Sequence, residues 1–492
     1  MSSGALLGLD IGTTKVKGAI FAPGGGVVAS ADHPHATARA RSGWSEQDAG
    51  AWQRAVAAVL AELDRQADLA AVGSVGICSQ VNTHLFVDAH GDPLAPAITW
   101  QDGRCGDVAA ELDERLDDAA RRRIWGEPYH VDASYLVARA IWMERERPDV
   151  WERTCSVLSP KDYINLWLTG EPASDPISSI GLTDGHEYLS RLDELMPGVA
   201  ERLPALRDPA DAVGSVREGR LGLPAVPVAA GTMDAWANLV GSGVAGPGEG
   251  IHVAGTSEIL GVLSDRGAGA PGVVTFPERD GLRLHAGPTQ AGGDALRWAA
   301  EAWDRPIDEV LGSASLAPAG SAGALFLPHL AGERAPVWDS RLRGAFAGLG
   351  FEHGREHLCR AVLEGVAFSA RQLLEAIVHA AGIAPPELVL SGGGAASDLW
   401  CQIKADVFGT PLRRCAILDT GVLGAAVLGG VAAGRLDRVD RGAEDFAGHD
   451  RVFEPELGHR ERYDDGYARY RAVQTALRGA LAPGASDPGT PS

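Results

Sequence analysis

A short pattern of strand, Gly-Thr turn and strand occurs twice in this chain, once near the N-terminus and once just past the middle. The copies span residues 6–21 (LLGLDIGTTKVKGAIF) and 251–263 (IHVAGTSEILGVL), and their Gly-Thr pairs lie 243 residues apart. Because this spacing is about half of the 492-residue chain, the repeat predicts two similar domains. We expect the domains to face each other across a cleft, which is a common place for a ligand.

Elsewhere, short apolar runs alternate with helical patterns, which is typical of an α/β fold. The glycine- and proline-rich segment 242–250 is the expected domain boundary. We therefore expect an N-terminal domain at 1–243, a C-terminal domain at 244–482 and a disordered tail at 483–492. In the first domain the pattern predicts strands at 6–9, 16–21, 27–31 and 72–78, and helices at 48–67, 106–124 and 134–147.

Net charge and composition exclude some classes of binding partner and indicate the cellular location. The formal net charge of -21 argues against binding to a nucleic-acid backbone. The six cysteines are scattered, without a CxxC pair or a histidine at zinc spacing, so we expect reduced, mostly buried thiols. The chain shows no signal peptide and no run of about 20 apolar residues, so we expect no membrane span and a cytoplasmic location.

The first turn, Asp10-Ile11-Gly12-Thr13-Thr14-Lys15, has the chemistry of a phosphate-binding turn. Glycine and hydroxyl residues between two strands can direct N–H and O–H donors at phosphate oxygens, and Lys15 adds a positive charge. Asp10, at a strand end, could hold Mg²⁺ through water. An ordinary hairpin turn is the alternative for one copy alone. The second copy, Gly255-Thr256-Ser257, favours phosphate binding, because paired turns can hold both ends of a triphosphate.

A third segment combines a strand, the loop Gly392-Gly393-Gly394 and a helix from about Ser397. Glycines let the backbone approach a nucleotide closely, and a helix N-terminus favours anions. A packing loop without a ligand is the alternative.

Asp234 follows the strand-like run 226–230 and stands at the expected start of a helix. A carboxylate in this place can simply cap the helix. It can also act as a general base that takes the proton from an attacking hydroxyl. The residue pattern alone leaves both interpretations open.

Polar residues follow another apolar strand, in the segment from Ser79 to His84, and recur in the segment from Trp100 to Arg104. Such side chains suit a small polyhydroxy ligand, and a solvated loop is the alternative. A lone histidine such as His84 is more often structural than catalytic. The candidate substrate-binding residues are Gln80, Asn82, Thr83, Trp100, Asp102, Arg104 and Asp234.

Two nucleotide-binding patterns are excluded. Residues 241–246 fit GxGxxG, but an expected helix precedes them, whereas a dinucleotide fingerprint needs a strand there. The chain also lacks the GxxxxGK(S/T) loop of P-loop NTPases.

Taken together, these segments resemble the FGGY carbohydrate kinases of the actin-like ATPase superfamily. The resemblance runs from Gly8 to about Gly430 and is most specific at 344–349 and 357–364, with a further match at 332–336. It implies two ribonuclease H-like domains closing on ATP, Mg²⁺ and a sugar. It also implies that Asp234 is the catalytic base, Asp10 a metal-side carboxylate, 12–15 and 255–257 the phosphate turns, and 392–394 the adenosine loop.

The substrate is less clearly indicated. Xylulokinases resemble Gln-Met-His-Gly where this chain has Gln80 to Thr83, and glycerol kinases resemble Gln-Arg-Glu-Thr. Glycerol kinases also carry Gln after the catalytic aspartate, where this chain has Ala235. We expect a pentulose such as xylulose, with an erythritol- or glycerol-like polyol as the alternative. A catalytically weak sugar sensor and an actin-like or chaperone ATPase are the rival interpretations. The expected oligomeric state is a homodimer.

Overall fold

A computed structural model describes residues 4–125, 130–267, 269–440 and 446–481. The predicted tail at 483–492 lies outside the described residues. The chain forms two compact units. Unit 1 comprises Met1–Gly243, Pro277–Arg279 and Thr420–Ala447, and unit 2 comprises Val244–Phe276, Asp280–Asp419 and Gly448–Ser492.

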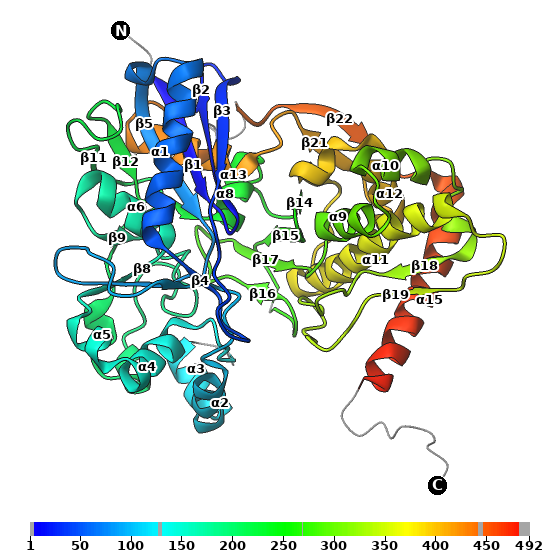
Figure 1. The fold of residues 1–492 in the computed structure, drawn as a ribbon, viewed down its shortest axis with the longest axis horizontal. Helices are drawn as coiled ribbons and strands as arrows, with labels where there is room; N and C mark the ends of the chain where they lie inside the picture. The colour runs from blue at the N-terminus through cyan, green and yellow to red at the C-terminus, as the bar shows by residue number, and fades with distance from the viewer. Residues whose placement is uncertain (1–3, 126–129, 268, 441–445, 482–492) are drawn as a thin grey trace. The chain divides into compact units, whose positions relative to one another are not determined.

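Unit 1 is built on a seven-stranded sheet with the order β11-β12-β5-β1-β2-β3, and β13 also pairs with β5 (Figure 1). β1 runs antiparallel to β2 and parallel to β5, and β2 runs antiparallel to β3. The strands are β1 (Ala5–Ile11), β2 (Lys15–Phe21), β3 (Val27–Pro34), β5 (Val72–Ser79), β11 (Ala212–Ser215), β12 (Pro227–Ala229) and β13 (Thr232–Met233).

Helices cover both faces of this sheet. Leu9 and its cross-strand partner Gly18 face α1 (Ala49–Gln66), where Val59 and Leu63 contact Gly18. Because side chains alternate along a strand, Gly8 points to the opposite face, where it meets α13 (Thr420–Ala432). The other helices beside the sheet are α6 (Pro160–Thr169) and α8 (Asp234–Gly241).

α13 packs on the sheet backbone to backbone. An ideal Cβ on Gly76 of β5 would lie 1.7 Å from the carbonyl oxygen of Ala425, and one on Gly8 would lie 2.0 Å from that of Val422. Only glycine allows this approach. α8 meets α13 in the same way, since a Cβ on Gly424 would lie 1.9 Å from the oxygen of Ala237.

The remainder of unit 1 has a second core of its own, formed largely by helices. The expected single helix at 106–124 is wrong, because α2 (Gly106–Arg115) ends before Leu116, which is extended, and Asp117 accepts a hydrogen bond from the Ala120 N–H in α3 (Asp118–Trp125). The elements are β4 (Glu46–Gln47), β6 (Leu85–Val87), β7 (Ala97–Ile98), α2 (Gly106–Arg115), α3 (Asp118–Trp125), α4 (Leu136–Glu146), α5 (Pro148–Arg153), β8 (Ser156–Leu158), β9 (Ala173–Ser174), α7 (Leu192–Leu195) and β10 (Ala205–Leu206).

Unit 2 repeats the central topology of unit 1. Its seven-stranded sheet has the order β16-β17-β15-β14-β20-β21-β22, so that β20-β14-β15-β17 corresponds to β5-β1-β2-β3. β14 runs antiparallel to β15, in agreement with the predicted strand, turn and strand, and the structure adds that β14 runs parallel to β20. The strands are β14 (Gly250–Ala254), β15 (Glu258–Ser264), β16 (Val274–Thr275), β17 (Arg283–Pro288), β20 (Leu388–Ser391), β21 (Leu412–Cys415) and β22 (His449–Phe453).

The long helix α11 (Arg355–Ala381) packs along this sheet and buries most of its own length (Figure 1). The remaining elements of unit 2 are α9 (Gly293–Ala302), α10 (Ile307–Ala314), β18 (Leu325–Leu327), β19 (Ala345–Ala347), α12 (Asp398–Phe408) and α15 (Arg460–Ala480).

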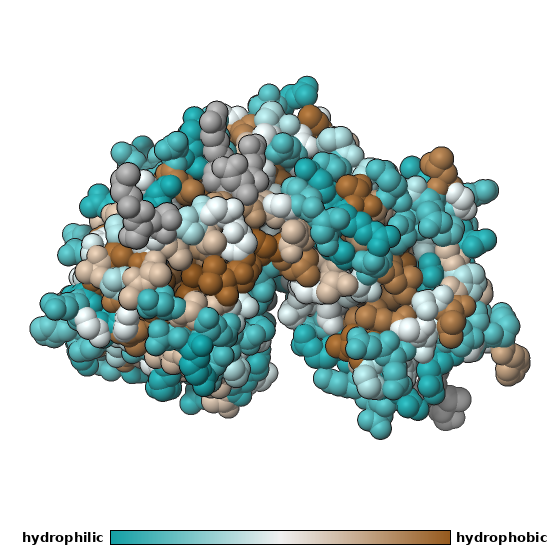
Figure 2. All heavy atoms as spheres, turned by 90° about the horizontal axis from the view of Figure 1, so that it is seen from above, coloured by the Kyte–Doolittle hydropathy of each residue, from teal (hydrophilic) through white to brown (hydrophobic). Residues whose placement is uncertain are grey.

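The polarity of the surface and the state of the cysteines match what the composition predicts. The face drawn in Figure 2 carries many hydrophilic residues, with smaller apolar groups among them. No helix in the described part of the chain is long and apolar enough to cross a membrane. All six cysteines lie in the described ranges; none forms a disulfide, and five are buried.

Candidate active site

Two carboxylates, Asp10 and Asp234, stand at the carboxyl ends of strands that both pair with β5 in the unit 1 sheet. β1 and β13 both run parallel to β5, and Asp10 and Thr232 are each paired with Cys78. Asp234 begins α8 directly after β13. The pKa of the Cys78 thiol is raised well above its ordinary value by burial and then by the negative charges of Asp10 and Asp234. The charges of Asp234, the candidate base, and of Asp10, the candidate metal-side carboxylate, therefore both affect the buried thiol of Cys78.

The backbone before Asp234 is held firmly. Gly231 has φ +69°, and an ideal Cβ there would lie 1.8 Å from the carbonyl oxygen of Ile77, so this bend requires glycine. The hydroxyl of Thr232 donates to Asp175 at 3.1 Å. Met233, and not Asp234, is the N-cap of α8, and the half-buried Asp234 carboxylate accepts from the Ala235 N–H at 2.7 Å. Asp234 is thus fixed at a helix start without being the cap residue.

The carbonyl oxygens of the first Gly-Thr turn accept hydrogen bonds from other parts of the protein. His35 hydrogen-bonds to the Gly12 oxygen at 2.9 Å through Nε2 and donates its backbone N–H to the Thr14 oxygen. Gln47 donates to the Thr13 oxygen at 2.7 Å. Among the described residues, the amides of Thr13 and Thr14 donate no hydrogen bond. Lys15, half-buried, pairs with Asp32 at 3.2 Å.

The carbonyl oxygens of the second Gly-Thr turn also accept hydrogen bonds within the protein. The N–H groups of Gly292 and Asp294 donate to the Thr256 oxygen, and that of Gly293 donates to the Gly255 oxygen, so the start of α9 binds the carbonyl side of the turn. Within the described ranges, the amides of Thr256 and Ser257 likewise donate to no acceptor. In the described chain each turn therefore has two adjacent N–H groups that donate to no acceptor, and this is the donor arrangement that phosphate binding requires.

The glycine loop lies directly against the second turn. Gly392 has φ +86°, and an ideal Cβ there would lie 2.6 Å from the carbonyl oxygen of Ala254, the residue before Gly255. Gly394 also packs on Ala254, whereas Gly393 faces open space. Ser397 caps α12 by accepting from the Trp400 N–H. The predicted strand, loop and helix are confirmed.

Two predicted substrate residues, Gln80 and Trp100, form hydrogen bonds with the first turn. The Trp100 indole N–H donates to the Thr13 hydroxyl at 3.0 Å, and this hydroxyl donates to Gln80 Oε1 at 3.2 Å. Gln80 is 2% exposed and its amide donates to Gln47 at 2.8 Å. These side chains tie the two polar segments to the turn, so the alternative of a solvated loop is wrong.

Asp102 and Arg104 form a buried pair. Arg104 donates to both oxygens of Asp102, at 2.9 and 2.7 Å, and to Glu46 at 2.8 Å. Its guanidinium carbon lies 3.5 Å from the ring centroid of Trp44. The Arg104 side chain is 4% exposed and that of Asp102 is fully buried, so the pair stiffens this segment.

Asn82 and Thr83 differ in accessibility. Thr83 is fully buried and accepts from the Trp100 N–H. Asn82 has φ +51°, a left-handed conformation that asparagine tolerates better than most residues. It lines a pocket together with the polar side chains of Ser178, Ser179 and Tyr188. Of the six candidates in these two segments, Asn82 is the one that lines this pocket.

The sequence patterns missed Arg139, which bonds to the first polar segment and to the two residues directly before the second. Arg139 is fully buried on α4 and donates to the carbonyl oxygens of Asn82, Ile98 and Thr99 and to His84 Nδ1. Burial lowers its pKa to about 10. Burial and the Arg139 charge also hold the pKa of His84 well below its ordinary value, so His84 is neutral. An arginine inside the apolar run 136–143 was the available signal.

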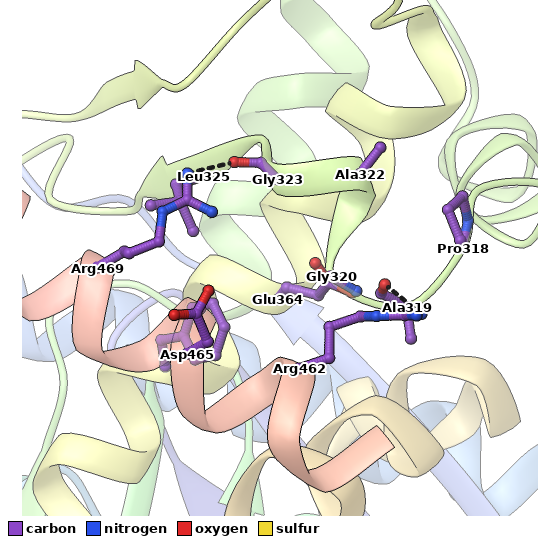
Figure 3. Close-up of a pocket in the computed structure, with 12 residues that line it drawn as sticks. Pro318, Ala319, Gly320, Ala322, Gly323, Leu325, Glu364, Arg462, Asp465 and Arg469 are labelled. Carbon is purple, nitrogen blue, oxygen red and sulfur yellow. Dashed lines mark hydrogen bonds between the residues drawn. The ribbon is translucent and has the colours of Figure 1, made fainter. Parts of the chain in front are cut away.

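A second hollow lies in unit 2, between the loop before β18, α11 and α15 (Figure 3). Arg462 and Arg469 donate across it to the oxygens of Ala319 and Gly323, and Glu364 accepts from the Gly320 N–H. No predicted site residue lines it. Its polar groups serve mainly to hold the loop.

Both halves of the chain match models of one known family. The N-terminal and C-terminal domain models of the FGGY family of carbohydrate kinases match residues 5–241 and 250–433. A xylulose kinase of Escherichia coli (strain K12) is 31% identical over 442 residues, covering 87% of this chain and 90% of the relative.

The chain belongs to the FGGY family of carbohydrate kinases. A glycerol kinase of Geobacter sp. (strain M21) is also similar, with 31% identity over 492 residues, covering 92% of this chain and 94% of the relative. The crystal structure of xylulose kinase from Rhodospirillum rubrum is 30% identical, with a TM-score of 0.82, and covers 97% of this chain and 99% of that one. The predicted α/β fold class, FGGY membership and enzyme class, an ATP-dependent carbohydrate kinase, are confirmed.

Proposed function

We propose that this FGGY kinase transfers the γ-phosphoryl group of ATP to a hydroxyl of a pentulose, with xylulose as the first candidate. The observation that carries the proposal is that Asp10, near the end of β1, and Asp234, directly after β13, both stand at the end of β5 and both act on the Cys78 thiol there. Similarity to proteins named xylulose kinase supports the choice of sugar.

In this proposal Asp234 is the catalytic base. Its carboxylate orients the acceptor hydroxyl and takes the proton as the oxygen attacks the phosphorus in line with the leaving ADP. The fixed backbone at Gly231 and Thr232 keeps the carboxylate in place, which favours a well-positioned attack.

The phosphates of ATP would bind N–H donors of the two turns, Gly12 to Lys15 and Gly255 to Ser257, with Lys15 adding positive charge. Gly392, Gly393 and Gly394 would lie against the adenosine. This assigns the sugar and the base to residues 1–243 and ATP mainly to residues 244–482.

The donor set near Asp10 fits Mg²⁺. Mg²⁺ takes oxygen ligands and not thiols, and the carboxylates of Asp10 and Asp234 are the hard oxygen donors that act on this end of β5. We propose that Asp10 holds Mg²⁺ through water. Mg²⁺ would neutralise charge on the phosphates during transfer. A cytoplasmic location and a homodimer stay predictions.

A substrate panel tests the proposed function. ADP release would be measured with Mg²⁺ and ATP across pentuloses, hexuloses, tetritols, pentitols and glycerol. We expect turnover to be highest with a pentulose. Preferred turnover of a polyol would replace the pentulose with the alternative that the glycerol kinase relative supports. Nucleotide binding without turnover on any compound would favour a sugar sensor.

We expect the Arg139→Met variant to raise KM for the sugar at least about tenfold, because Asn82 and Thr99 lose the donor that fixes their carbonyl groups. KM for ATP should change less than about twofold. The matched control is Arg145→Met, which removes an exposed arginine from the same helix. Equal increases in both KM values, or no change in either, would contradict this role.

A further inference from the structure

A buried carboxylate follows the second Gly-Thr turn. Glu258, the first residue of β15, is fully buried, and both of its carboxylate oxygens lie 2.9 Å from the Lys404 ammonium. His252 of β14, also fully buried, hydrogen-bonds to the same carboxylate through Nε2. The three side chains form one buried network in unit 2, with the Glu258 carboxylate bonded to both of the others.

This network joins the two segments that we assign to the nucleotide. Lys404 lies on α12, the helix that follows the glycine loop, and Glu258 directly follows Ser257. The Lys404 ammonium also lies 4.4 Å from the ring centroid of Trp400, a residue beside Gly394. The turn and the loop thus touch directly at Ala254 and are joined again through Glu258 and Lys404.

The corresponding place in the first copy is built differently. Lys15 follows Thr14 there, is half-buried, and pairs with Asp32 near the surface. In the second copy both charges are out of water. Burying an ion pair incurs a desolvation cost that often cancels its attraction, so such a pair is weak evidence for stability. The more informative property of the Glu258–Lys404 pair is the position in which it holds the second Gly-Thr turn.

The charge states are consistent with a fixed network. Burial opposes ionisation of Glu258, but the Lys404 charge and the hydrogen bond from His252 outweigh it, and the pKa of Glu258 is lowered. Burial lowers the pKa of His252, so its ring is neutral and donates one N–H to the carboxylate. The carboxylate therefore stays charged and bound to both partners.

We infer that Glu258 and Lys404 are positioning residues for the nucleotide, which set the second phosphate turn at a fixed place relative to the glycine loop. This inference rests on the proposed assignment of these segments to ATP. Neither side chain touches the ligand; they act through the backbone of Thr256, Ser257 and the glycine loop.

The test separates position from stability with three variants: Lys404→Met, Glu258→Gln, and the two combined. Each single change leaves a buried group without its partner, so both melting temperature and nucleotide affinity should fall. In the double variant the unpaired charge is gone, and the amide oxygen introduced at position 258 can still accept from His252. Its melting temperature should recover to within about 3 °C of the wild type.

Affinity for Mg²⁺-ADP, measured by titration calorimetry, is the deciding readout. We expect the double variant to bind at least about tenfold more weakly than the wild type despite its recovered melting temperature. KM for ATP should rise by the same factor, with KM for the sugar unchanged. Recovery of wild-type affinity together with the melting temperature would show that the pair is only structural.

Two further measurements complete the test: a second substitution of Lys404 and a control substitution of another buried pair. If the double variant does not recover its stability, Lys404→Arg keeps a cation that can still pair with Glu258, so its nucleotide affinity should exceed that of Lys404→Met, and equal affinity in these two variants would overturn the inference. The control is Arg360→Met with Glu364→Leu, a buried pair on α11, which should lower stability and leave nucleotide affinity unchanged. Loss of affinity in this control would also overturn it.

The binding readout keeps this inference separate from the proposed function. Wild-type protein that binds Mg²⁺-ADP but shows no sugar-dependent turnover would count against the kinase activity and leave the network open to the same test. Wild-type protein that binds no nucleotide would overturn the inference itself.

Discussion

Replacing Asp234 with Asn should lower kcat with the preferred sugar by about 10²- to 10⁴-fold, the range for loss of a general base. The amide keeps nearly the same shape and can still accept from the Ala235 N–H, so the helix start should stay intact. An amide cannot take the proton of the attacking hydroxyl. Steady-state ADP release and the melting temperature would be measured on the same preparation.

The matched control for this change is Asp107→Asn, which alters an exposed carboxylate in the first turn of α2. Its kcat should remain within about twofold of the wild type. A kcat for the Asp234→Asn variant within tenfold of the wild type would rule out Asp234 as the base. A large fall in melting temperature would show instead that Asp234 is mainly structural.

Replacing Gly76 with Ala should destabilise unit 1 by about 3 kcal/mol or more, because the added methyl group has no space. An ideal Cβ would lie 1.7 Å from the Ala425 oxygen and 2.6 Å from its carbonyl carbon. Both are backbone atoms of α13, so the whole helix must move away from β5. Urea unfolding, followed by fluorescence, would measure the change in free energy of unfolding.

Gly312→Ala is the control for this second change. Gly312 lies in α10, and a Cβ there would meet nothing within 4 Å, so alanine should be neutral or slightly stabilising. A Gly76→Ala variant as stable as the wild type would show that α13 does not pack on β5 in the manner described.

The sequence predicted the elements that depend on local pattern. The repeated strand, turn and strand, the glycine loop before α12 and the start of α8 at Asp234 were all recognisable, because turn chemistry and short apolar runs lie close together in the chain. The break between α2 and α3 was missed, since Asp117 looks like an ordinary surface residue of one continuous helix.

The direction of side chains could not be predicted in the same way. Gln80 and Asp102 have the chemistry of ligand contacts, but their hydrogen-bond partners, Gln47 and Arg104, decide that they face inward. Arg139 was overlooked because its partners are carbonyl groups of two distant loops, which leave no pattern in the sequence. α13 has apolar residues on all sides, so its sequence could not show which sheet it covers.

The placement of α13 has a consequence for synthesis on the ribosome. The strands β1 and β5 emerge early, but the helix that covers one face of their sheet begins at Thr420, within a segment that belongs to unit 1. At about 5–20 residues per second, translation from residue 243 to residue 432 takes roughly 10 to 40 s. During that interval Gly8 and Gly76 lie in a sheet that still lacks α13. A fragment ending at residue 243 would therefore need residues 420–432 supplied as a separate peptide to complete its fold.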